Sequence, residues 1–191
     1  MILNNESILS LYRNLGDHMY SGEPVTQLEH AWQCAQLASS AGASDSLKLA
    51  AWLHDLGHLL VDHEGTPTLR GVDDRHEEVA AHLLEPYFGL AVSEPIRLHV
   101  KAKRYLVTRN PEYFSKLSED SVRSLELQGG LMSDSEFKVF SNTPFSNDAL
   151  QLRAWDDLGK KQGFFAVTRD EALKQLHLLM QTVLIAKRQL T

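Results

Sequence analysis

Apolar residues recur mostly three and four positions apart along the chain, which is the spacing of helices that bury one face. Ser44 is a predicted N-cap, and Ser133 with Glu136 predicts a capping box. Pro95 is expected in the first turn of its helix. Segments that alternate polar and apolar residues, as strands do, are nearly absent. The pattern predicts an all-α fold, a compact helical bundle, with helices at 6–15, 25–42, 44–60, 74–88, 94–107, 118–130, 133–140, 145–161 and 168–190.

The composition sets broad limits on what the chain can be. Its 191 residues suit a single domain spanning 1–191, 43% of them are hydrophobic, and the formal net charge is −6. The acidic balance argues against a broad nucleic-acid-binding face, and no apolar run reaches membrane-spanning length. Cys34 is the only cysteine, which excludes an intrachain disulfide and a cysteine-based zinc site. Because the segment 1–20 lacks the pattern of a signal peptide, we expect a soluble, cytoplasmic protein.

The apolar stretch AWLHDLGHLL, residues 51–60, contains three ionisable side chains. If the predicted helix runs through it, His54 and His58 share a face, and Asp55 lies about 100° around the helix. Buried groups of this kind need a hydrogen-bonding partner or a metal ion. Taken alone, the pair His54-Asp55 is also typical of a structural pair that is hydrogen-bonded to the backbone.

Four further candidate ligands lie on other predicted helices: His30, His76, His99 and Asp156. Each of them alone is typical of an ordinary core or surface residue. Together with His54 and Asp55 they supply four histidines and two aspartates from five helices. This set suffices for two metal ions that share a bridging carboxylate, and imidazole with carboxylate suits iron, manganese or zinc.

The order His, His-Asp, His, His, Asp resembles the di-iron branch of the HD-domain superfamily, to which myo-inositol oxygenase belongs. Five stretches resemble a smaller subgroup of that branch, namely YSGEPVTQLEHAWQCA, HDLGH, HVKAKRYL, LQGG and LRAWDD. Members of this subgroup are oxygenases that cleave the carbon–phosphorus bond of 1-hydroxy-2-aminoethylphosphonates. The resemblance spans about residues 20–157 and implies an HD-domain helical bundle.

The resemblance implies a centre of two iron ions in the mixed-valent Fe(II)/Fe(III) state. One iron is expected to bind His30, His54, Asp55 and Asp156, and the other to bind Asp55 as a bridge, His76 and His99. The implied partners are a small-molecule hydroxyphosphonate and O2, with no nucleic acid and no membrane. Phosphate and a carboxylic acid are the expected products.

Tyr20 and Glu23 lie just before the helix predicted at 25–42. The resemblance implies a catalytic role for both residues. Tyr20 would close the dioxygen site as an iron ligand until substrate arrives, and Glu23 would bind the amino end of the substrate. Without the resemblance, a half-buried aromatic residue and an acid favoured by the helix dipole are the simpler interpretations.

A dianionic phosphonate needs cations and hydrogen-bond donors around it. Lys103 lies four positions after His99, so it is expected to share the helix face of that histidine. Arg153 lies one turn before the aspartate ligand predicted on its own helix. A surface salt bridge is the other interpretation of either cation, and Arg104 is expected to be solvated. The predicted substrate contacts are Glu23, His58, Lys103, Ser124, Gln128 and Arg153.

The resemblance implies an oxygenase, and we expect it to cleave (1R)-1-hydroxy-2-(trimethylammonio)ethylphosphonate to glycine betaine and phosphate. Asp73 and Asp74 favour this substrate over the primary amine, because negative charge attracts a quaternary ammonium group. One alternative is 2-amino-1-hydroxyethylphosphonate, cleaved to glycine and phosphate. Others are an HD-type metal-dependent phosphohydrolase that uses metal-activated water and a non-catalytic binding module. The residues expected to play ordinary surface or core roles are His18, Cys34, His63, His82 and His177.

Overall fold

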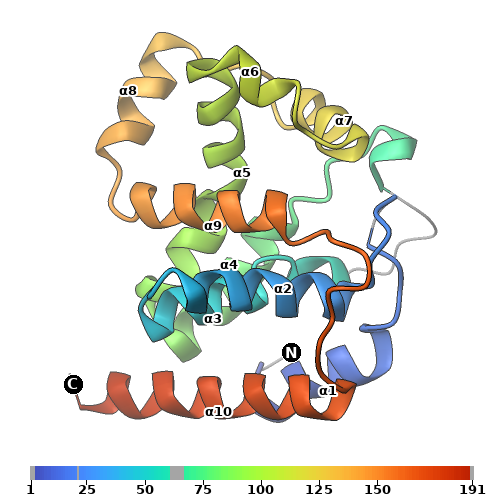
Figure 1. The fold of residues 1–191 in the computed structure, drawn as a ribbon. Coiled ribbons are helices and arrows are strands. Elements are labelled where there is room, and N and C mark those ends of the chain that lie inside the picture. The colour runs from blue at the N-terminus through green and yellow to red at the C-terminus, as the bar shows by residue number, and fades with distance from the viewer. Residues whose placement is uncertain (1–2, 21, 61–66, 190–191) are drawn as a thin grey trace.

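The computed structural model describes residues 3–20, 22–60 and 67–189, and within these ranges it is all-α (Figure 1). An isolated bridge between Met19 and Thr26 is the β-type contact found in this part of the chain. The all-α prediction is therefore confirmed. The elements are α1 (Asn5–Leu15), α2 (Gln27–Ser40), α3 (Asp45–Leu53), η1 (Leu56–Leu59), η2 (Pro67–Arg70), α4 (His76–Phe88), α5 (Leu90–Arg109), α6 (Pro111–Phe114), α7 (Glu119–Leu127), α8 (Asp134–Asn142), α9 (Ser146–Leu158) and α10 (Arg169–Arg188), where η marks a 3-10 helix.

Polar residues cap the first turns of several helices. The Ser44 hydroxyl accepts a hydrogen bond from a backbone N–H in the first turn of α3. Ser133 and Glu136 form the predicted capping box of α8, and Thr26 and Glu29 form another at α2. Because each cap satisfies N–H groups that lack a partner within the helix, it fixes the residue at which the helix begins.

Helix α5 begins at Leu90, so Pro95 lies inside the helix and the prediction that it lies in the first turn was wrong. Gly89 separates α4 from α5 with a φ of +84°, a conformation that glycine adopts without steric cost. The helix therefore restarts at once after α4. Contacts with α4 and α9 support it through the position where Pro95 cannot donate a backbone hydrogen bond.

The helix predicted at 44–60 breaks in the middle of the HDLGH stretch. α3 ends at Leu53, Asp55 leaves the helical conformation with φ −101° and ψ 12°, and η1 follows. Gly57 shows the reason, because a β-carbon there would lie closer than 3.0 Å to the backbone of His76. Instead of continuing as a further turn of α3, the chain forms η1, which packs closely against the start of α4. His54 and His58 therefore do not share a helix face, and that prediction was wrong.

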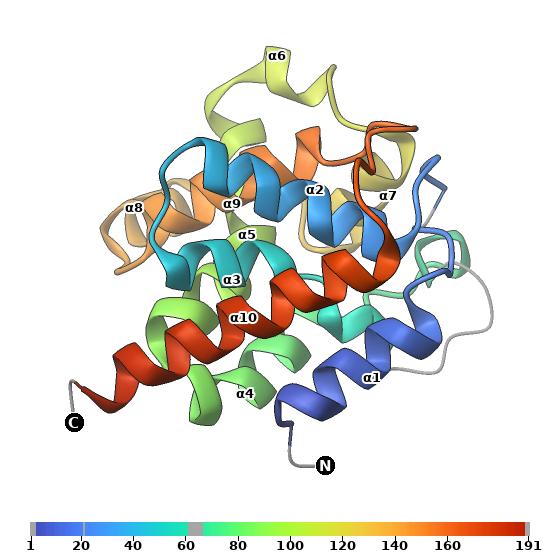
Figure 2. The same ribbon diagram turned by 60° about the horizontal axis from the view of Figure 1, so that its bottom comes forward.

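Helix α5 lies at the centre of the bundle. It packs against α4 and α9, and it also contacts α3. α2 lies beside α3 and α9, while α10 runs along the other side of α3 and packs against α1 (Figures 1 and 2). One apolar core fills the space among these helices, and a smaller one lies between α5, α8 and α9. Side chains from α2, α3, α4, α5 and α9 can therefore reach one common site.

Two expectations concern the chain as a whole. Within the described ranges, the helices are too short or too polar to cross a bilayer. The organisation of 1–191 as a single domain and the cytoplasmic location stay predictions.

Gly57→Ala is expected to lower the free energy of unfolding by about 1–3 kcal/mol, the usual cost of overpacking. The added methyl group would press on the backbone of His76, which can move only with the start of α4. Chemical denaturation followed by circular dichroism measures the change. Lys101→Ala, at an exposed position of α5, is the control and should shift stability by less than about 0.5 kcal/mol. Equal stabilities of Gly57→Ala and the native chain would contradict tight packing of η1 on α4.

Candidate metal centre

All six candidate ligands predicted from the sequence lie together in the interior of the bundle. Their side chains fall into two groups of atoms that lie within 4.8 Å of one another, and Asp55 belongs to both. His30 comes from α2, His54 from the end of α3, His76 from the first residue of α4, His99 from α5 and Asp156 from α9. All six residues are buried.

The two carboxylate oxygens of Asp55 face two different pairs of histidines. Oδ2 lies 3.5 Å from His30 Nε2 and 3.2 Å from His54 Nε2. Oδ1 lies 3.3 Å from His76 Nε2 and 3.8 Å from His99 Nε2. Within each pair the two Nε2 atoms are 3.3 Å apart. Asp55 therefore occupies the position of a bridge between two sites.

The other ring nitrogen of each of these histidines faces a hydrogen-bond acceptor. Three Nδ1 atoms face backbone carbonyls: His30 at 2.9 Å from Gly159 O, His54 at 3.1 Å from Ala51 O and His99 at 2.7 Å from Ile96 O. His76 Nδ1 lies 2.9 Å from a carboxylate oxygen of Asp74. Because these oxygens only accept, a proton on each Nδ1 would satisfy them, and the Nε2 atom of each ring, which faces the centre, would then be available to a metal ion.

Two carboxylate oxygens at the centre have no hydrogen-bond partner among the described residues. They are Asp55 Oδ2 and Asp156 Oδ1, and both are fully buried. Although burial alone would raise the pKa of Asp55, His54, His30 and His76 hold it well below the usual range. Buried carboxylate oxygens that lack hydrogen-bond partners are costly unless cations satisfy them. The donor set therefore fits metal ions.

Tyr20 and Glu23 lie in a turn that covers one end of this centre. Tyr20 N donates to Val25 O at 2.9 Å, and Glu23 N donates to Tyr20 O at 2.7 Å. The Tyr20 ring stacks on His30 with 4.1 Å between ring centroids. Burial, with Asp55 and Asp156 nearby, raises the pKa of the Tyr20 phenol well above its usual range. The structure thus brings Tyr20 to the candidate centre, and its role there stays a prediction.

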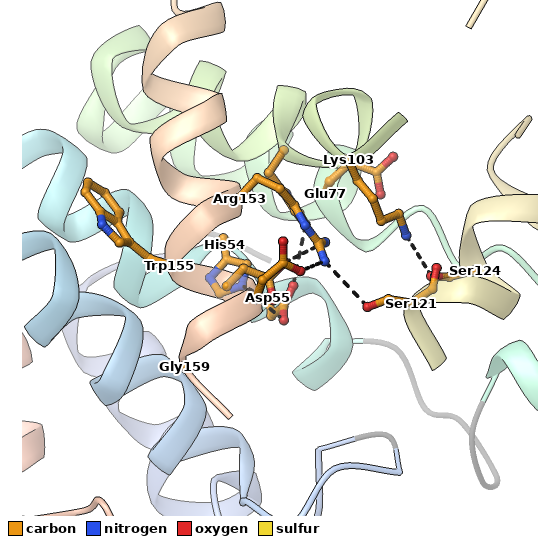
Figure 3. A network of polar contacts seen from close by, with 12 residues as sticks. His54, Asp55, Glu77, Lys103, Ser121, Ser124, Arg153, Trp155 and Gly159 are labelled. Atoms are coloured by element: carbon orange, nitrogen blue, oxygen red, sulfur yellow. Dashed lines mark hydrogen bonds and ion pairs between the residues drawn. The ribbon is translucent and has the colours of Figure 1, made fainter. Parts of the chain in front are cut away.

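A cavity adjoins the candidate centre, and five of the predicted substrate contacts line it: His58, Lys103, Ser124, Gln128 and Arg153. Lys103 from α5 donates to Ser124 on α7 at 2.7 Å, and Arg153 from α9 reaches Ser121 at 3.5 Å (Figure 3). Arg153 also forms an ion pair of 2.7 Å with Asp156. The two cations thus lie between the candidate ligands and the hydroxyl groups of α7.

Both cations are buried, unlike ordinary surface salt bridges. Only 2% of Lys103 and 4% of Arg153 is exposed. Burial and the nearby Arg153 lower the pKa of Lys103 to about 7. An anion in the cavity would favour the charged form of this lysine, because opposite charges stabilise each other where water is excluded.

Arg104 does not play the role predicted for it, and Asp74 has partners within the protein. The Asp74 carboxylate contacts His58 Nδ1 at 2.7 Å and His76 Nδ1 at 2.9 Å, so it orients two rings. Asp73 and Asp74 both line the cavity, and their attraction for an ammonium group stays a prediction. Arg104 is not solvated. Its side chain donates to Gly130 O at 2.9 Å and contacts Glu136 at 2.9 Å, and it therefore fixes the turn after α7.

The residues expected to play ordinary roles lie away from the two ligand groups, with one exception. His18 and His82 are exposed and His177 is half-buried, whereas His63 lies outside the described residues. Cys34 is fully buried, and its Sγ lies 3.7 Å from His30 Nε2 and 3.5 Å from Trp155 O.

Sequence reasoning missed several residues of the cavity, and Lys160 is the most prominent among them. Its Nζ lies 3.4 Å from Glu23 Oε1 and 3.8 Å from Asp156 Oδ1. The spacing of four residues from Asp156 was a signal for this position. Thr68, Asp120 and Ser121 also line the cavity, and they come from segments with no chemical motif.

Comparison with known proteins identifies the family. A model of the HD domain matches residues 28–131, which include His30, the His54-Asp55 pair, His76 and His99. The chain belongs to the HD-domain family. The HD domain is a helical fold, and within the matched residues the His54-Asp55 pair is buried at the end of α3.

Curated relatives place this HD-domain chain with phosphonate dioxygenases. It is 49% identical over 161 residues to a hydroxymethylphosphonate dioxygenase of Gimesia maris, covering 83% of this chain and 80% of the relative. It is 40% identical over 157 residues to the glycine-betaine-forming [1-hydroxy-2-(trimethylamino)ethyl]phosphonate dioxygenase of Leisingera caerulea, covering 82% and 80%. It is also 40% identical over 162 residues to protein L432 of Acanthamoeba polyphaga mimivirus, covering 84% and 74%. The resemblance to the phosphonate-cleaving oxygenases is confirmed.

His76→Ala is expected to lower the metal content by about one ion per chain, because it removes one of the three candidate ligands of the second site. Elemental analysis of protein purified after iron-replete expression measures the loss. His82→Ala is the matched control, since His82 is exposed on the same helix and should leave the content unchanged. An unchanged metal content in His76→Ala would exclude this residue as a ligand.

Proposed function

We propose that this chain is a di-iron oxygenase that cleaves the carbon–phosphorus bond of a 1-hydroxyphosphonate and releases phosphate. The observation that carries the proposal is the convergence of four histidine Nε2 atoms on the two oxygens of Asp55, beside a cavity lined by buried cations. The names of the relatives support the class of reaction.

The residues at the centre have the chemistry to hold two iron ions. His30, His54, Asp55 and Asp156 would hold one, and Asp55, His76 and His99 the other. Bound in the mixed-valent state, the iron pair would activate dioxygen and would act as a Lewis acid toward the hydroxyl group of the substrate. Asp74 keeps the His76 proton on Nδ1, so its Nε2 stays free to bind metal.

The phosphonate end of the substrate belongs beside Lys103 and Arg153. Both side chains are buried on the cavity wall and carry charge or can acquire it, which suits a dianion. The hydroxyl groups of Ser121 and Ser124 and the amide of Gln128 add hydrogen-bonding groups on the α7 side. The carbon that bears the hydroxyl group would then face Asp55 and the histidines.

We further propose hydroxymethylphosphonate as the substrate, in place of the trimethylammonio compound predicted from the sequence. Two of the three acids expected to attract a cation are engaged within the protein, Glu23 with Lys160 and Asp74 with two histidines, while the third, Asp73, is exposed at the cavity. The relative that is 49% identical to this chain is named for hydroxymethylphosphonate, which supports this choice. Cleavage of hydroxymethylphosphonate by one O2 would yield formate and phosphate. The trimethylammonio and amino compounds stay alternatives that the same assay tests.

Oxygen uptake measured together with phosphate release tests the reaction. Hydroxymethylphosphonate is expected to give one phosphate per O2 consumed, at a kcat/KM at least about tenfold above the values for the trimethylammonio and amino hydroxyphosphonates. A higher kcat/KM with a cationic compound would replace the proposed substrate. Phosphate release from phosphate esters without oxygen uptake would favour the phosphohydrolase, and absence of bound metal would favour a binding module.

Lys103→Met is expected to raise KM by about tenfold or more without loss of metal, because it removes a buried cation from the phosphonate site. Steady-state kinetics and elemental analysis on the same preparation separate the two effects. Lys101→Met removes an exposed lysine from the same helix and should change neither value. An unchanged KM in Lys103→Met would show that the phosphonate binds elsewhere.

A further inference from the structure

Lys160 lies directly after α9 and points toward a segment that is distant in the sequence. Its ammonium group lies 3.4 Å from Glu23 Oε1 and 5.4 Å from the centroid of the Tyr20 ring. The side chains of Lys160 and Glu23 are each only 12% exposed. The pair therefore joins the turn before α2 to the end of α9 at the edge of the candidate centre.

The backbone around Lys160 is held to α2 on both sides. Gly159 O faces Nδ1 of His30 at 2.9 Å. The Gln33 amide donates to Lys161 O at 3.0 Å and accepts from Lys161 N at 3.1 Å. These contacts fix the residues before and after Lys160, so its position beside Glu23 is built into the fold.

Glu23 depends on Lys160 for charge compensation. Its Oε1 is buried and has no hydrogen-bond partner among the described residues. Lys160 forms ion pairs with Glu23 and with Asp156, whose Oδ1 lies 3.8 Å away, and its charge also acts on Lys103 across the cavity. A buried carboxylate that lost the cation beside it would strongly attract another one.

We propose that Lys160 determines the substrate class by neutralising Glu23 and placing a positive charge on the cavity wall. The proposal rests on the proposed function for the position of the phosphonate beside Lys103 and Arg153. Lys160 lines the same cavity as these two residues, so a group attached to the carbon of the substrate meets it. With Lys160 in place the site accepts an uncharged substituent, and an ammonium group would have to displace Lys160 from Glu23.

Removal of Lys160 should therefore turn the preference toward cationic ligands. The probes are ethylphosphonate and 2-aminoethylphosphonate, which differ in the ammonium group and lack the hydroxyl group needed for turnover. Isothermal titration calorimetry on iron-loaded protein without oxygen gives the Kd of each. In Lys160→Met the ratio of the ethylphosphonate Kd to the 2-aminoethylphosphonate Kd should rise by about tenfold or more over the native value.

Matched variants separate this role from a structural one. Lys160→Arg keeps the charge and should retain the native Kd ratio. Lys161→Met removes the neighbouring lysine, which contacts Phe164 instead of the cavity, and should also retain the native ratio. In a Glu23→Gln background, Lys160→Met should change the ratio by less than about threefold, because the carboxylate to be neutralised is gone. Lys160→Gln is a second variant that must shift the ratio in the same direction, whether or not Lys160→Met folds.

Three results would overturn the proposal. Equal weakening of both probes in Lys160→Met would show that Lys160 binds the phosphonate group. An unchanged Kd ratio would show that Lys160 does not control the preference for a charged substituent. Absence of binding by both probes would show that the proposed subsite does not exist. Failure of the oxygenase proposal is separate, since it appears as absence of oxygen uptake and leaves these binding ratios measurable.

Discussion

Three backbone carbonyls and one carboxylate determine what the interior of this bundle can do. They face Nδ1 of His30, His54, His99 and His76 and so turn the four Nε2 atoms toward Asp55. The six candidate ligands are buried, and two of the carboxylate oxygens lack a hydrogen-bond partner among the described residues. Cations at this position would offset the cost of burying these polar groups.

The break in the helix at the His-Asp pair is the local event that makes a bridge possible. In a continuous helix, Asp55 would project about 100° away from His54 and could not turn both oxygens between two pairs of rings. Because α3 ends at Leu53 and η1 approaches the first residue of α4, Asp55 lies between the rings from α2, α3, α4 and α5. Gly57 permits this approach, so the backbone of HDLGH matters as much as its ionisable side chains.

Helical periodicity predicted most of the fold. The order of the histidines and aspartates predicted that the six candidate ligands form one site. Periodicity is a local signal, however, and it could not reveal that contact with α4 ends α3 early. Arg104 was misjudged for a related reason, since its partners follow from how the turn after α7 packs. The pair between Lys160 and Glu23 joins segments near opposite ends of the chain, and no local pattern marks such a contact.

The two ends of the cavity carry different residues and, in our proposal, bind different parts of the substrate. At one end, Lys103 and Arg153 suit a phosphonate group, which is common to the substrates named for both phosphonate dioxygenases. At the other end, Lys160 lines the cavity and pairs with Glu23 behind it, and in our proposal the charge balance of this pair selects the substituent. Relatives with the same fold and reaction can thus differ in substrate through a few charges at the edge of the site. Substrate preference in this family is therefore best sought in residues such as Lys160, outside the histidine and aspartate motif.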